Sequence, residues 1–172
     1  RRSCGIHYVR RHMNSYRVTK YNPKNRDDQG RYRASEWTSI SDIGRKYCGH
    51  VLTEEKYEEI ENSYLDIASA FLKEAGVTHM VVKFDPGEIS PPRKYRHGDA
   101  VDVVAVRKIL RSLLREHYWC CLESGSGAFI HVGYDYYMYV GGPTEGSKWK
   151  ALATARNLFV EEICASPYKT EI

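Results

Sequence analysis

The most informative pattern of hydrophobic and polar positions in the chain runs from Ala128 to Val140 and repeats every two residues. This period predicts one long strand with an apolar face in the core and a second face that mixes aromatic and polar side chains. The apolar positions are Ile130, Val132, Tyr134, Tyr136, Met138 and Val140, and the mixed positions are Phe129, His131, Gly133, Asp135, Tyr137 and Tyr139. We expect the mixed face to be open to solvent and to serve as a binding platform.

Two other segments have apolar residues at the 3.6-residue spacing of amphipathic helices. The first is predicted over 53–75, with Thr53 as N-cap and Gly76 after its last turn. The second is predicted over 99–116 with Asp99 as its cap, and a shorter third helix over 147–158. Runs rich in β-forming residues predict further strands over 16–21, 77–84, 118–123 and 159–164, with a hairpin turn over 124–127 and a loose tail after the last strand.

The order of these elements from Val77 to Cys164 is βαββαβ, which is the ferredoxin-like arrangement. An additional strand and helix precede this unit, and we expect them to extend its sheet or to cover one face. The predicted fold class is therefore α+β, a mixed α/β domain with a ferredoxin-like core over 77–164. A chain of 172 residues fits one such domain.

Charge divides the chain at Met13. The formal net charge is +4, and the first twelve residues hold four arginines and no acidic residue. From Met13 onward 22 Lys and Arg balance 22 Asp and Glu. We therefore expect residues 1–12 to be an upstream or disordered extension and 13–172 to be the single domain, so that the basic pI is weak evidence for nucleic-acid binding.

The cellular setting follows from hydropathy and cysteine usage. No apolar run approaches the roughly 20 residues that cross a bilayer. The five cysteines are odd in number and form no C-x-x-C pair, which is typical of free thiols in a reducing compartment. We expect a cytoplasmic protein that has no contact with membranes.

Metal-binding patterns are weak. Cys48 and His50 are separated by one residue, which is too close for the common zinc-binding spacing. Cys120 and Cys121 point to opposite faces of a strand and so do not converge on one ion. We expect no metal and no cofactor.

Catalytic patterns are equally weak. On one strand His131 and Asp135 lie about 13 Å apart, too far for a hydrogen bond, and a cross-strand pair of His131 with Glu123 is easier to build. The glycine-rich segment 141–148 departs from the phosphate-loop spacing. No catalytic residue is assigned, and a small hydrolase with an unrecognised site stays an alternative.

RNA binding is a second alternative. RNA-recognition modules stack bases on exposed aromatic residues of the third strand of a βαββαβ unit, and here that strand is 128–140. Against this, the basic-Gly-aromatic-Gly-aromatic pattern of such modules is absent, and the segment 77–84 offers Val and Met where a stacking ring is needed.

Three motifs resemble those of a family of small, uncharacterised bacterial cytoplasmic proteins. They are Arg-Val-Thr-Lys-Tyr-Asn-Pro at 17–23, Glu-Trp-Thr-Ser-Ile-Ser-Asp-Ile-Gly at 36–44 and His-Val-Gly-Tyr-Asp-Tyr-Tyr-Met-Tyr-Val-Gly at 131–141. Proteins of this size and kind are similar to immunity proteins, which neutralise a cognate toxin by binding it. The resemblance implies a protein partner, such as a toxin domain, and no catalytic residue.

Tyrosine, tryptophan and carboxylate side chains suit such an interface because the rings anchor contacts and carboxylates match a basic toxin surface. The predicted function is therefore non-enzymatic protein binding. The candidate contact residues are Phe129, His131, Asp135, Tyr137 and Tyr139 on the predicted strand, and Glu36, Trp37 and Asp42 as a second patch.

Overall fold

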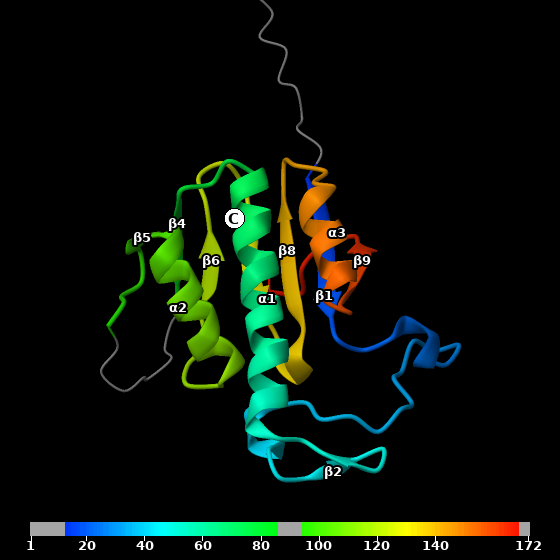
Figure 1. The fold of residues 1–172 in the computed structure, drawn as a ribbon. Coiled ribbons are helices and arrows are strands. Elements are labelled where there is room, and N and C mark those ends of the chain that lie inside the picture. Colours follow the sequence, from blue (N-terminus) through cyan, green and yellow to red (C-terminus); the bar gives the residue numbers. More distant parts are fainter. Residues whose placement is uncertain (1–12, 86–93, 169–172) are drawn as a thin grey trace, which may run out of the picture.

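A seven-stranded sheet with three helices on one of its faces forms the described part of the chain (Figure 1). The computed structural model describes residues 13–85 and 94–168. The helices are α1 (Glu54–Glu74), α2 (Val103–Leu114) and α3 (Lys148–Ala155). The large sheet holds β1 (Asn14–Thr19), β4 (His79–Lys83), β5 (Ala100–Asp102), β6 (Cys121–Glu123), β7 (Phe129–Val132), β8 (Met138–Gly142) and β9 (Phe159–Ile163); β2 (Lys46–Tyr47) and β3 (His50–Val51) form a separate hairpin.

The strand order is β5-β4-β6-β7-β8-β1-β9, and every neighbouring pair is antiparallel. The α+β class is thereby confirmed. The ferredoxin-like core is not confirmed, because the sheet is larger: β5 extends it beyond β4, and β1 lies between β8 and β9. β1, the first strand in the sequence, therefore lies inside the sheet and not at its edge.

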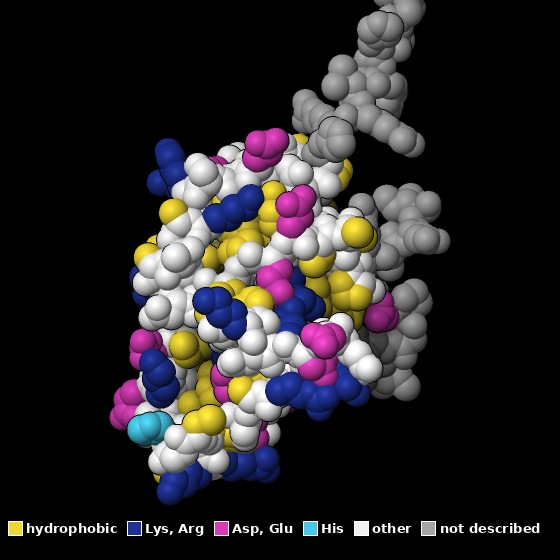
Figure 2. Space-filling model, turned by 90° about the vertical axis from the view of Figure 1, so that its right-hand side faces the viewer, with side chains coloured by type: hydrophobic (Ala, Val, Ile, Leu, Met, Phe, Trp, Pro, Cys, Tyr) yellow, Lys and Arg dark blue, Asp and Glu magenta, His cyan; other side chains and the backbone are white. Residues whose placement is uncertain are grey.

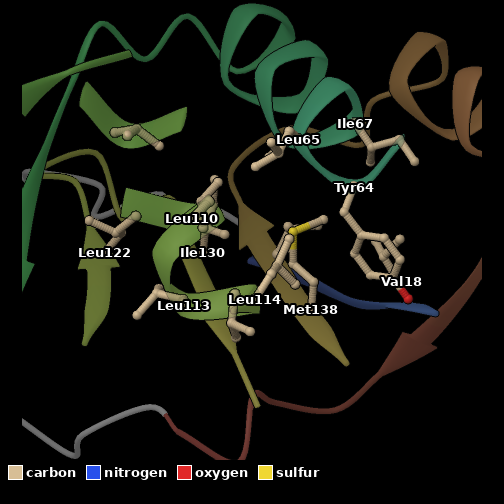
Figure 3. Packing of buried hydrophobic residues seen from close by; sticks show 14 of the residues in the cluster. Val18, Tyr64, Leu65, Ile67, Leu110, Leu113, Leu114, Leu122, Ile130 and Met138 are labelled. Atoms are coloured by element: carbon tan, nitrogen blue, oxygen red, sulfur yellow. The ribbon is translucent and has the colours of Figure 1, made fainter. Parts of the chain in front are cut away.

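The helix-covered face of the sheet holds one hydrophobic core (Figure 3). Side chains of α1 and α2 meet alternate residues of the strands, because a helix buries one stripe and a strand buries every second side chain. The residues labelled in Figure 3 come from both layers: Val18, Tyr64, Leu65, Ile67, Leu110, Leu113, Leu114, Leu122, Ile130 and Met138. The opposite face of the sheet, called the helix-free face below, carries no described helix.

The first helix matches its prediction closely because its ends are encoded locally. The Thr53 side chain accepts a hydrogen bond from the Lys56 N–H, and Gly76 follows the last turn with a φ of 67°. The second helix begins later than predicted. Asp102 caps it in place of Asp99, and Val104, expected in the core, is 61% exposed.

The segment 128–140 is a hairpin and not the single long strand predicted from its period. β7 and β8 pair in register, with His131 opposite Tyr139 and Phe129 opposite Gly141. The chain reverses at Asp135 and Tyr136, whose φ angles are 56° and 63°. Aspartate tolerates this left-handed conformation better than most residues, and burial of the Tyr136 ring offsets the strain at its own backbone.

Candidate functional site

The helix-free face carries a continuous row of polar side chains that crosses six strands. Each member lies directly opposite the next in the strand register, so that their side chains point to the same side of the sheet. From the β4 side to the β9 side the row is Lys83, Cys121, His131, Tyr139, Arg17 and Glu161. The alternation that buries one face thus leaves ionisable groups on the other.

Charges at both ends of this row are paired. The Arg17 Nε donates to a Glu161 carboxylate oxygen at 2.9 Å, and Arg26 donates to the same carboxylate. Burial alone raises the pKa of Glu161, but the hydrogen bonds from the two arginines hold it below its ordinary value. At the other end Lys83 forms an ion pair with Glu123.

The C-terminal segment, residues 164–168, is held against the middle of the row. The Ser166 hydroxyl and the Nδ1 of His131 share a hydrogen bond of 2.8 Å, and the Cys121 thiol donates to the Tyr168 carbonyl at 3.7 Å. The Tyr168 ring lies 5.7 Å from the Tyr139 ring, between centroids. This segment therefore covers side chains that the sequence pattern places on an open face.

The expectation of an exposed aromatic platform is wrong for three of its residues. Phe129 is 3% exposed, His131 0% and Tyr139 9%. Phe129 stacks on His131 at 4.7 Å between ring centroids, and the C-terminal segment lies against their neighbours. Asp135 is exposed in the turn, and Tyr137 is half-buried beside Arg17.

The second predicted patch is largely internal. Trp37 is 8% exposed and packs against Tyr57 and Tyr136, while Asp42 is 6% exposed. Asp42 closes a capping box with Ser39, since its carboxylate accepts from the Ser39 N–H at 3.3 Å. Glu36 pairs with Lys20 at 3.0 Å. The expectation of an open patch is wrong for Trp37 and Asp42.

Ser166, His131 and Glu123 follow one another in the order of a hydrolase triad. The His131 Nε2 lies 3.7 Å from a Glu123 oxygen, and its Nδ1 bonds Ser166. A nucleophile must meet its substrate, yet Ser166 is 5% exposed and its oxygen also accepts from the Tyr168 N–H. The chain of contacts fastens the C-terminal segment to the sheet.

Cys121 is not set up as a nucleophile either. Burial and the nearby carboxylates of Asp85 and Glu123 raise the pKa of its thiol to about 11, so the thiol stays protonated near neutral pH. Reactive cysteines require the opposite shift. Among residues 13–85 and 94–168, no group of three or more His, Cys, Asp or Glu is arranged to hold a metal ion.

An aromatic pocket of 110 Å³ opens at the Lys83–Cys121 end of the row. Its rings come from Trp119 before β6, Tyr134 in the turn after β7, and Tyr168 in the C-terminal segment. The Trp119 and Tyr134 centroids are 5.4 Å apart, and the Tyr134 side chain is 70% exposed. Asp85 also lines this pocket.

The turn that carries Tyr134 is held in place by the buried side chain of Tyr136. Tyr136 is 3% exposed, and its ring makes edge contacts with Trp37, Tyr57 and Tyr64. The Tyr64 hydroxyl donates to the Tyr136 carbonyl at 2.9 Å. Because Tyr136, two residues after Tyr134, is fixed in the core, the backbone of the turn is held in place while the Tyr134 side chain is exposed.

Sequence reasoning misses this pocket for two reasons. The two-residue period places Tyr134 on the buried face of a continuous strand, and the residues around Tyr168 carry no strand or helix pattern and so predict a loose tail. The signal that could locate the turn is Gly133 followed by Asp135, since both residue types favour turns. Nothing local links Trp119 to Tyr168.

In the described part of the chain no helix has the length and apolar character needed to cross a bilayer. Comparisons with protein-family models, curated protein sequences and solved structures give no match. The resemblance to a family of small bacterial proteins stays a prediction.

Proposed function

We propose that this chain is a non-enzymatic protein-binding domain whose contact site is the aromatic pocket of Trp119, Tyr134 and Tyr168. The observation that carries the proposal is the Tyr134 side chain, which is 70% exposed and packs against Trp119 at the pocket mouth. A partner protein can bury this large exposed ring with little rearrangement, because the turn that carries it is fixed. Tyrosine and tryptophan are the residue types that most often dominate binding energy at interfaces.

The narrower form of the proposal is that the partner is a bacterial toxin domain, as the sequence resemblance implies. The acidic side chain of Asp85 at the pocket suits a basic partner surface. Coexpression with a candidate toxin tests this form: the wild-type chain protects the cells, and a chain with Tyr134→Ala does not.

RNA binding has less support than protein binding. Base stacking needs accessible ring faces, whereas Phe129 and Tyr139 are 3% and 9% exposed. On the side of the molecule that carries α3 and β9, the Lys and Arg side chains and the Asp and Glu side chains are scattered among one another (Figure 2). A strand of nucleic acid is held best by a surface of one sign.

Hydrolysis also has less support. Ser166 and His131 are 5% and 0% exposed, so a substrate does not reach them, and the Cys121 thiol is protonated near neutral pH.

Site-specific photocrosslinking tests the proposal. Photoreactive benzoylphenylalanine replaces Tyr134 in one chain and, as the matched control, Val104 in another, since Val104 is 61% exposed on α2. We expect one protein to be crosslinked from position 134 and not from position 104. Tyr134→Ala should then weaken binding of that purified protein about thirtyfold, which corresponds to about 2 kcal/mol. Equal crosslinking from both positions, or unchanged affinity of the alanine variant, would overturn it.

A further inference from the structure

We propose that the aromatic pocket binds the ammonium end of a lysine side chain, unmodified or methylated, on the partner protein. This inference rests on the proposed function and adds the chemical class of the group that is recognised.

The walls of the pocket suit a cation. Trp119, Tyr134 and Tyr168 line one small cavity, and Trp119 and Tyr134 meet at an interplanar angle of 46°. The faces of aromatic rings carry partial negative charge and attract ammonium groups within about 6 Å, and they do so most strongly when the cation loses water. Tilted rings let one cation approach more than one ring face.

The charge around the pocket has the matching sign. Lys83 is paired with Glu123, so that these two groups largely cancel. Asp85, which is exposed at the pocket, adds a negative charge. Burial is the main cause of the raised pKa of the Cys121 thiol. The Asp85 and Glu123 carboxylates raise this pKa further, and each outweighs the opposite effect of Lys83, so the charges around the thiol are negative on balance.

The same chain already builds a site of this kind for one of its own lysines. The Lys20 ammonium lies 4.0 Å from the Tyr21 ring centroid and 4.1 Å from that of Trp37. Glu36 accepts its hydrogen bond at 3.0 Å. Two rings and a carboxylate therefore hold an ammonium group here. The aromatic pocket combines three rings with the Asp85 carboxylate, and the Lys83 ammonium that also lines it is paired with Glu123.

The volume also fits. The pocket measures 110 Å³, and an engineered protein cavity of about 150 Å³ accepts benzene. A trimethylammonium group has one nitrogen and three methyl carbons, fewer heavy atoms than benzene. A lysine chain reaches the pocket with its last carbon atoms while the rest of the partner stays outside.

A pair of matched small molecules tests the inference. Choline carries a trimethylammonium group, and 3,3-dimethylbutan-1-ol has the same shape without the charge. Each is titrated into the full chain while tryptophan fluorescence is recorded, because Trp119 is the tryptophan at the pocket. We expect choline to bind at least fivefold more tightly than the neutral alcohol. Tyr134→Ala, which removes one ring, should abolish the response to choline.

A substitution of the acidic group separates charge from shape. Asp85→Asn should weaken choline binding about fivefold and leave the alcohol unaffected, whereas Asp28→Asn, at an exposed carboxylate outside the pocket, should change neither. Equal binding of choline and the alcohol, or no binding of choline, overturns the inference. The proposed function survives that result if Tyr134→Ala still weakens the crosslinked partner. If choline binds and the partner is unaffected by Tyr134→Ala, the site is one for a free alkylammonium compound and the protein-lysine assignment is overturned.

Discussion

Gly133 lies directly against the Tyr168 ring, and an alanine at this position should displace that ring. A Cβ at position 133 would lie 2.7 Å from the Tyr168 ring and hydroxyl oxygen. The backbone itself accepts alanine, because Gly133 has a φ of −107°. The cost of Gly133→Ala therefore comes from displacing one ring and not from the main chain.

The expected loss in the free energy of unfolding follows from the contacts that the Tyr168 ring makes. The Tyr134 N–H donates to the Tyr168 hydroxyl at 3.4 Å, a long hydrogen bond that contributes about 0.5 kcal/mol. The contact between the Tyr168 and Tyr139 rings adds about 0.5–1.5 kcal/mol. Gly133→Ala should thus lower the free energy of unfolding by about 1–2 kcal/mol.

A double-mutant cycle isolates this contact. In a Tyr168→Ala background the clash is gone, and Gly133→Ala should be neutral or should stabilise the fold by about 0.4–1 kcal/mol, because alanine restricts the unfolded chain. Urea unfolding of the four proteins measures the coupling. Gly125→Ala is the matched control, because a Cβ added at Gly125 would meet no heavy atom within 4 Å. Equal effects of Gly133→Ala in both backgrounds would refute the reasoning.

Three further predictions concern charge. Glu61 is 1% exposed and accepts hydrogen bonds from both Arg111 and Arg115. Glu61→Gln should therefore lower the free energy of unfolding by about 1–3 kcal/mol in urea unfolding. The control Glu59→Gln, at an exposed carboxylate, should change it by less than about 0.5 kcal/mol. Burial lowers the pKa of Lys20 to about 8, against about 10.4 in an unfolded chain. Between these two values the unfolded chain binds more protons than the folded chain, so the free energy of unfolding should rise between about pH 8 and 9.5. Urea unfolding at a series of pH values measures this rise, and Lys20→Met should remove it. Because the pKa of the Cys121 thiol is raised to about 11, iodoacetamide at pH 8 should alkylate the exposed Cys48 and Cys164 and leave Cys121 unmodified. Rapid alkylation of Cys121 in peptide mass maps would contradict the raised pKa.

Elements with local signals are predictable from the sequence. The first helix has a cap at Thr53, a stop at Gly76 and an apolar stripe between them, and all three signals agree. The second helix has two aspartates able to cap it, and the choice of Asp102 depends on β5 pairing with β4, which is a long-range contact. Local pattern alone cannot separate Asp99 from Asp102.

The candidate site is less predictable than the fold. A strict two-residue period hides the reversal at Asp135, because the residues on both sides of the turn keep the same alternation. The burial of Phe129 and His131 depends on the C-terminal segment folding back across the sheet, which a hydropathy pattern does not encode. The pocket joins residues at 119, 134 and 168, so only the tertiary structure reveals it.

The most direct test of the central claim, that the aromatic pocket binds an ammonium group, is the ¹⁵N–¹H spectrum of the three tryptophan indoles during addition of choline. Trp119 lies in the pocket, while Trp37 and Trp149 are 8% and 0% exposed and serve as internal controls. Binding in the pocket predicts a saturable shift of the Trp119 signal alone. An unchanged Trp119 signal, or equal shifts of all three, would contradict it.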